Sequence, residues 1–442
     1  MKGAQKGGVL GLPGSGAWRA FLTEQDRVRA MTVVRELANL VMTEYPLAPG
    51  TVQNRGYSLG SGYLGHALLL AYAGEVFREE AWSKGADRLV SVAMTEVPGS
   101  RLVPGLFGHA VGFGWVAAHF ARYFAWFEAI DLDDLDEALR GYVLGTRPPT
   151  NYDLISGLVG VGVYALERLP SDAGAEIIKA VVSALAREAV EDDGDLTWIT
   201  PPSDTNPELR RHFPHPSFNF GVAHGIPGVI GFLGRVVLAG VHNDLTLELL
   251  RRASSWLVKH PLGYDSPSFY SCRTDLAYAG PPSRLAWCYG DAGILPQIFA
   301  AADALSDRDL YDFGIRVGVK SLRRVSRGHG VIDPALCHGS AGLLHLYNRL
   351  WQFTSDERFR DFALVWFADT FARRESGRGA AGFPFITPNL PAGATYEKMS
   401  EWQTGFLEGT SGIGLALLAS VSDGVPPHWD RLLLADLPER SR

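Results

Sequence analysis

One feature constrains the fold of this chain more than any other. A Gly-x-x-Gly step followed by an apolar run recurs seven times, at intervals of 43 to 70 residues. The shorter intervals are typical of arrays of supersecondary units, and the longer ones indicate insertions. Each apolar run is hydrophobic nearly all round, which predicts an inner helix packed on both sides. The steps begin at Gly62, Gly105, Gly157, Gly225, Gly290, Gly339 and Gly409.

Longer amphipathic segments alternate with these runs, and each predicts an outer helix with one charged face. Examples are residues 23–42, 171–191, 306–326 and 355–374, and Ser306 is predicted to cap the third. The pattern predicts an all-α fold, an (α/α) toroid or barrel of seven inner and seven outer helices. We favour a closed ring over an open solenoid because neither terminal unit carries a polar capping repeat.

The repeats predict a single toroid domain over residues 21–442, preceded by a flexible, Gly-rich arm at residues 1–20 that lacks the apolar core of a signal peptide. Three Pro-rich or β-containing insertions interrupt the helical pattern near residues 191–220, 260–287 and 377–402. Each insertion precedes an inner helix, so in a ring the three gather at one rim, around the mouth of the cavity. Plain surface elaboration is the alternative interpretation.

The composition argues against several classes of function. The 442 residues are 46% hydrophobic, which is enough for a large core. The net charge of −7 includes no basic tract, so we expect no nucleic-acid binding. No apolar run is long enough for a membrane span, so we expect no stable membrane insertion. Three cysteines are too few for a disulfide framework and favour a cytoplasmic location.

Reactive side chains cluster at one point of the repeat, the residue before the first glycine. In three consecutive repeats they stand at or beside this point, as His224, then Cys288, then Cys337 with His338. If the repeats close into a ring, these side chains meet at one cavity mouth. The seven residues at this point are Ser61, Pro104, Ser156, His224, Tyr289, His338 and Glu408.

Cys288, Cys337 and His338 together offer two thiolates and one imidazole. This is the ligand set of a catalytic zinc with an open fourth position, and sulfur ligands favour Zn²⁺ over magnesium or calcium. A free cysteine is more often a buried small hydrophobe. A purely structural role is less favoured here because two of only three cysteines fall at the equivalent repeat position. Cys272 lies in an insertion, and we interpret it as structural.

Three further residues are candidates for catalysis. His224 occupies the same point as His338, which predicts a general acid or base beside the metal. Asp153 stands four residues before Gly157 and is either a helix N-cap or a carboxylate that orients a catalytic imidazole; the sequence leaves both open. Arg284, four residues before Cys288, is placed to stabilise developing negative charge.

The motifs AHG (223–225), WCYG (287–290) and CHG (337–339), together with the seven repeats, resemble the lanthionine synthetase C-like family, the lanthipeptide cyclases. The resemblance runs from about residue 56 to residue 420. It implies a toroid with a zinc in the central cavity. Carried over residue by residue, it implies the metal ligands Cys288, Cys337 and His338 and the catalytic residues His224, Asp153 and Arg284.

Members of this family close lanthionine or methyllanthionine rings. A peptide cysteine thiolate adds to dehydroalanine or dehydrobutyrine in a Michael-type reaction. The resemblance implies a stand-alone cyclase whose partners are a dehydrated lanthipeptide precursor, a separate dehydratase and an exporter. Two alternatives stay open, a relative that adds glutathione or another small thiol, and a zinc-stabilised peptide-binding scaffold. A glycosidase is disfavoured because it needs facing carboxylates, and Glu408 is the only acid at the seven points.

Overall fold

The computed structural model describes most of the chain. The described residues are 18–44, 56–97, 104–108, 110–146, 148–204, 210–211, 213–263, 265–275, 280–324, 329–385 and 403–438. Within them, fourteen α-helices account for nearly all of the regular structure. None of these helices combines the length and the hydropathy needed to cross a bilayer.

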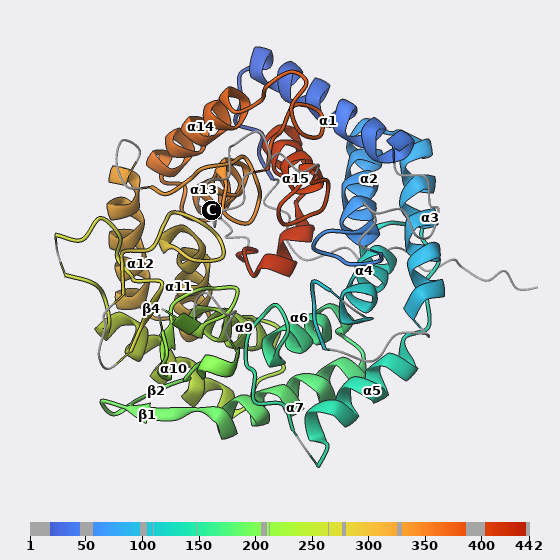
Figure 1. The fold of residues 1–442 in the computed structure, drawn as a ribbon. Coiled ribbons are helices and arrows are strands. Elements are labelled where there is room, and N and C mark those ends of the chain that lie inside the picture. The colour runs from blue at the N-terminus through green and yellow to red at the C-terminus, as the bar shows by residue number, and fades with distance from the viewer. Residues whose placement is uncertain are drawn as a thin grey trace, which may run out of the picture.

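The described helices form two concentric layers around one axis (Figure 1). The inner layer consists of α2 (Tyr63–Phe77), α4 (Ala110–Tyr123), α6 (Leu158–Arg168), α9 (Ile226–Leu238), α11 (Asp291–Leu305), α13 (Ser340–Thr354) and α15 (Thr410–Val421). The outer layer consists of α1 (Glu24–Glu44), α3 (Glu80–Glu96), α5 (Asp133–Leu144), α7 (Asp172–Glu188), α10 (Asp244–Lys259), α12 (Arg308–Ser321) and α14 (Glu357–Ala372). The predicted (α/α) toroid of seven inner and seven outer helices is confirmed.

The ring closes through its first and last helices. The last inner helix, α15, packs against the first inner helix, α2. Its outer partner is α1, which comes from the opposite end of the chain, whereas every other inner helix packs on the outer helix that follows it. The expectation of a closed ring is therefore confirmed.

The second glycine of each repeat is required by a close backbone approach. A Cβ there would overlap the carbonyl oxygen of the residue six positions earlier, where the chain turns into the inner helix. In the second repeat this glycine is Gly112, whereas a Cβ on Gly108 would meet nothing. The predicted register of that repeat, at Gly105 and Gly108, is therefore wrong by four residues. The seven glycines are Gly65, Gly112, Gly160, Gly228, Gly293, Gly342 and Gly412.

The start of α12 also corrects a detail of the sequence analysis. Ser306 adopts a left-handed conformation, with φ 52°, and ends α11. The N-cap of α12 is Asp307, whose side chain accepts a hydrogen bond from the main-chain N–H of Leu310. The prediction of Ser306 as the cap is wrong by one residue, because the carboxylate of the next residue reaches the free N–H.

The insertions contain the few short strands and add one contact that sequence alone does not predict. Strands β1 (Val190–Asp192) and β2 (Asp195–Thr197) form an antiparallel hairpin. Strand β3 (Phe218–Asn219) of the first insertion pairs with β4 (Arg273–Thr274) of the second. Residues 386–402 of the third insertion, and residues 1–17 of the predicted N-terminal arm, lie outside the described residues.

The C-terminal segment 428–438, here called the C-terminal plug, lies inside the ring (Figure 1). It includes the 3₁₀ helix η5 (His428–Leu433) and contacts the later turns of the inner helices. Asp430 is fully buried and accepts hydrogen bonds from Arg349 at 2.5 and 3.0 Å. It also lies 2.8 Å from Nε2 of His345. Burial opposes ionisation of Asp430, yet the charge of Arg349 holds its pKa below the ordinary value.

We expect the C-terminal plug to contribute measurably to the free energy of unfolding. Replacing Asp430 by asparagine leaves the buried Arg349 without its carboxylate, which should lower the free energy of unfolding by about 2 kcal/mol. The same change at Asp312, whose partner Arg308 is 79% exposed, should cost less than about 0.5 kcal/mol. Urea unfolding of both variants measures the difference, and equal effects would show that the Asp430 pair does not hold the plug.

Candidate metal centre

The segments that lead into the inner helices, here called the mouth loops, are joined to one another by main-chain hydrogen bonds. The seventh loop bonds to the first, from Leu407 N to Gly60 O at 3.0 Å. A similar bond joins the first loop to the second. Each loop from the third to the sixth is joined in the same way to the loop that follows it. The donor and acceptor pairs are Gly60 and Phe107, Leu154 and Ala223, Ala223 and Cys288, Cys288 and Cys337, and Cys337 and Leu407. This ladder brings residues from distant repeats into one site.

The ladder sets the two cysteines of the predicted metal site side by side. The main-chain N–H groups of Trp287 and Cys288 both donate to the carbonyl oxygen of Cys337, at 3.1 and 3.3 Å. His338 follows directly, at the start of the turn into α13. One donor atom from each of Cys288, Cys337 and His338 lies within 4.8 Å of the other two. The structure therefore brings together all three predicted ligands.

This cluster fits a zinc ion. A tetrahedral zinc holds sulfur at about 2.3 Å and nitrogen at about 2.0 Å, so its ligand atoms lie roughly 3.5 to 4 Å apart. The donor atoms of the cluster lie within 4.8 Å of one another, so side-chain movements of about 1 Å would bring them into this range. In the described part of the chain, no other group of three His, Cys, Asp or Glu residues brings its donor atoms as close.

The environment of the cluster favours ionisation of one thiol. A hydrogen bond from the Cys337 thiol lowers the pKa of Cys288 well below its ordinary value, against the opposing effect of burial. The same bond, together with burial, raises the pKa of Cys337. The charge of Arg284 also acts to lower the pKa of Cys288. The structure thus places the predicted Arg284 close enough to act on the cluster.

Asp333 is a member of the site that the sequence analysis missed. Its side chain is fully buried, and its Oδ2 atom lies 3.0 Å from Nε2 of His338. Its other oxygen accepts a hydrogen bond from the main-chain N–H of Ala335 at 2.9 Å. Because Nε2 of His338 faces Asp333, Nδ1 is the nitrogen left for a metal. A carboxylate behind a ligating histidine fixes the ring and raises its basicity.

Removing this carboxylate should weaken metal binding. We expect Asp333→Asn to lower the affinity for Zn²⁺ by about 10- to 100-fold, the usual loss when such a supporting group is replaced. Competition with a colorimetric chelator measures the affinity, and Asp309→Asn on the exposed start of α12 is the matched control. An unchanged affinity in Asp333→Asn would show that the carboxylate does not support the ligand.

His224 and Asp153 form a pair at the mouth. Nδ1 of His224 lies 2.8 Å from Oδ2 of Asp153. The imidazole is 41% exposed, whereas the carboxylate is only 10% exposed. The remaining nitrogen, Nε2, is therefore available to a substrate. The N-cap of α6 is Gly157, so Asp153 is not the helix cap that the sequence left open. Its Oδ1 instead accepts a hydrogen bond from Ser156 N at 2.7 Å.

Two more residues border the candidate site. The ring of Tyr289 lies 6.2 Å from that of His224, at an interplanar angle of 28°. Tyr289 stands at the repeat point, but the sequence pattern predicted no role for it. Cys272, interpreted as structural, lies near enough to Arg284 and Cys288 for both to act on its pKa, which burial raises. It therefore borders the site, a contact created by the folding of the second insertion.

The fold and this cluster together define the class of protein. The family described as "Lanthionine synthetase C-like protein" matches residues 53–434, and the chain belongs to this family. The nisin biosynthesis protein NisC of Lactococcus lactis subsp. lactis is 22% identical over 328 residues, which cover 69% of this chain and 76% of that protein.

Two solved structures are similar to this chain to different degrees. The structure of nisin cyclase matches with a TM-score of 0.71 and 18% identity, covering 93% of this chain and 98% of that chain. A sugar epimerase from a ruminal bacterium matches with a TM-score of 0.48 and 10% identity, covering 89% of this chain and 98% of its own. The likeness to nisin cyclase shows a shared toroid architecture that includes nearly all of both chains.

Proposed function

We propose that this protein is a zinc-dependent lanthipeptide cyclase that forms lanthionine or methyllanthionine rings. The observation that carries the proposal is the position of the Cys288, Cys337 and His338 cluster beside the His224–Asp153 pair, at one mouth of the toroid. Membership of the lanthionine synthetase C-like family and the likeness to nisin cyclase support it.

The donor set suits the activation of a thiol. Cys288, Cys337 and His338 would hold a zinc ion through three protein ligands, and such an ion supplies the positive charge that makes a nearby thiol acidic near pH 7. Two ligand thiolates balance the charge of the ion. A peptide cysteine is therefore the substrate group that this end of the site is suited to receive.

The other residues handle the proton and the developing negative charge. Addition of the cysteine sulfur to the β-carbon of a dehydro residue forms one C–S bond and places negative charge on the neighbouring carbonyl. Arg284 is suited to stabilise that charge. The proton lost by the thiol must return to the α-carbon. His224, oriented by Asp153 through Nδ1, is suited to carry it on Nε2. The addition therefore needs neither an oxidant nor a reductant.

This chemistry also implies partners. The dehydro residues must be made beforehand, so we propose a separate dehydratase that acts on the same precursor peptide, and an exporter that takes the product. A cytoplasmic location fits both the free cysteines and these partners.

The experiment is ring formation by the purified, zinc-loaded protein on a dehydrated precursor peptide. Ring closure leaves the peptide mass unchanged but removes a free thiol, so alkylation followed by mass spectrometry counts the uncyclised cysteines. The proposal predicts progressive loss of alkylation. Addition of glutathione to the peptide without ring closure would support the small-thiol alternative, and peptide binding without any change would support a scaffold.

A further inference from the structure

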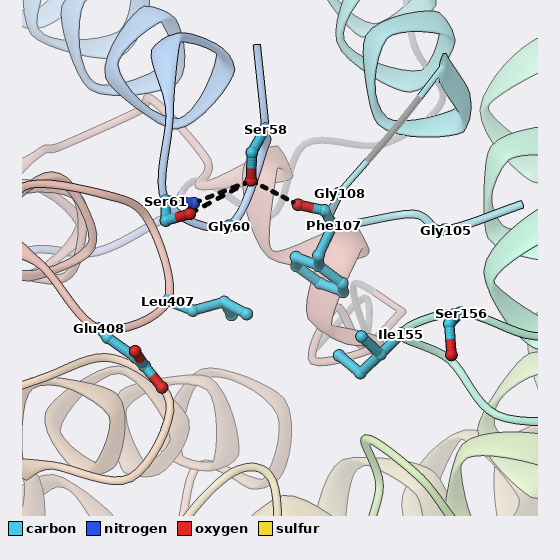
Figure 2. Close-up of a pocket in the computed structure, with 10 residues that line it drawn as sticks. All are labelled: Ser58, Gly60, Ser61, Gly105, Phe107, Gly108, Ile155, Ser156, Leu407 and Glu408. Carbon is cyan, nitrogen blue, oxygen red and sulfur yellow. Dashed lines mark hydrogen bonds between the residues drawn. The ribbon is translucent and has the colours of Figure 1, made fainter. Parts of the chain in front are cut away.

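A pocket opens in the mouth of the toroid, on the side formed by the last mouth loop and the first three (Figure 2). Its volume is about 280 Å³. The residues that line it include Phe107, Gly108, Ile155, Ser156, Leu407 and Glu408. None of them belongs to the predicted ligand or catalytic set.

The pocket borders the candidate site at both of its ends. At one wall, the carbonyl oxygen of Leu407 accepts a hydrogen bond from Cys337 N at 2.8 Å. The neighbouring Glu408 is close enough for its charge to act on Cys337. At the opposite wall, Ser156 N donates to Asp153, the residue that holds His224. A group seated in the pocket is therefore close to both the metal ligands and the proton carrier.

The pocket exists because one junction of the mouth differs from the others. Main-chain hydrogen bonds join the other neighbouring mouth loops, but in the described part of the chain none joins the second loop to the third. Figure 2 shows Phe107 and Gly108 of the second loop on one side of the opening, and Ile155 and Ser156 of the third loop on the other. A Cβ on Gly108 would meet nothing within 4 Å, so the space in front of it is free for a ligand.

The lining combines three serines with three apolar side chains, and its apolar part favours an apolar group. Phe107 as a whole is only 4% exposed, and its ring packs against those of Phe406 and Trp287, with ring centroids 6.4 and 6.0 Å away. Ile155 and Leu407 add apolar walls. Glu408 is the one charged residue of the lining, so an acidic group is disfavoured. A cavity of about 150 Å³ already accepts a benzene-sized molecule, and this pocket is larger.

We propose that this pocket binds an uncharged, apolar side chain of the substrate peptide, on a residue that flanks the reacting cysteine. The inference rests on the proposed function and extends it by assigning a specificity subsite to the mouth. Burying a leucine side chain should strengthen binding by about 10-fold or more relative to glycine.

The test uses two synthetic peptides, each with one cysteine and one dehydroalanine. The cysteine is flanked on both sides by leucine in one peptide and by glycine in the other. Ring closure is followed by thiol alkylation and mass spectrometry. Binding is measured by calorimetry on matched peptides with serine in place of the cysteine. On the zinc-loaded wild-type protein, the leucine peptide should bind about 10-fold or more tightly than the glycine peptide.

The variant Gly108→Leu adds a side chain at the pocket wall, where a Cβ meets nothing within 4 Å. It should lower the affinity of the leucine peptide to that of the glycine peptide, and leave zinc content and binding of the glycine peptide unchanged. Gly141→Leu is the matched control, since a Cβ on Gly141 also meets open space, but on outer helix α5. The control should bind both peptides as the wild type does.

The outcomes separate this inference from the proposed function. Equal affinity of the two peptides for the wild-type protein, or an unchanged preference in Gly108→Leu, overturns the assignment of the pocket. If rings form without any preference, the pocket assignment fails and the proposed cyclase activity stands. If the preference is present but neither cysteine peptide forms a ring, the pocket assignment stands and the cyclase proposal fails.

Discussion

Replacing Cys288 and Cys337 together by alanine should abolish zinc binding and ring formation. The two thiolates are two of the three predicted protein ligands, and His338 alone is a weak, single-point site for Zn²⁺. We expect the affinity for zinc to fall by at least about 10³-fold, so that purified protein contains less than about a tenth of an equivalent. Elemental analysis after dialysis against a weak chelator measures this loss.

Cys272→Ala is the matched control for this prediction. It removes the remaining cysteine, which borders the cluster but is not one of the three residues whose donor atoms lie within 4.8 Å of one another. The control should keep a full equivalent of zinc. Zinc retained by the double variant, or lost from the control as well, would show that the metal is held elsewhere.

Replacing His224 by asparagine should stop catalysis without removing the metal. If His224 carries the proton, its loss should slow ring formation by about 10²- to 10⁴-fold, the usual contribution of a general acid or base. Zinc content should stay at one equivalent, because His224 is paired with Asp153 and lies outside the cluster. Alkylation of uncyclised cysteines over time gives the rate.

His338→Asn provides the comparison for His224→Asn, because both variants exchange an imidazole for an amide at equivalent points of two repeats. His338→Asn should lose zinc, since an amide is a poor ligand for this ion. Equal zinc loss in the two variants would mean that His224 is a metal ligand. Full activity of His224→Asn would mean that water or another side chain carries the proton.

The sequence predicted the ring and the cluster because both follow from one repeated pattern. A glycine is needed wherever a Cβ would overlap the carbonyl oxygen six residues earlier, so the glycines mark the inner helices directly. Once the helices are placed on a ring, Cys288 and Cys337 fall at equivalent points. The second repeat was predicted four residues too early because Gly108 fits the spacing of the pattern, although a Cβ at its position would meet nothing within 4 Å.

Other features depend on contacts that the repeat does not encode. Asp333 lies five residues before His338 in an irregular turn, and only the folded turn aims its carboxylate at the imidazole. The C-terminal plug was missed because Asp430 meets Arg349 and His345 across more than 80 residues of chain. The pairing of β3 with β4 joins two insertions that have no shared sequence signal. Polar contacts of this kind follow from three-dimensional packing and leave no periodicity.

The central claim is that Cys288, Cys337 and His338 hold a zinc ion and leave its fourth position to a substrate thiol. X-ray absorption at the zinc edge tests it most directly, since sulfur at about 2.3 Å is distinguished from nitrogen or oxygen at about 2.0 Å. The account predicts two sulfur and two lighter ligands in the purified protein, and three sulfur ligands after addition of a cysteine peptide that has no dehydro residue and so cannot form a ring. A spectrum unchanged by the peptide, or a protein with no bound zinc, would contradict it.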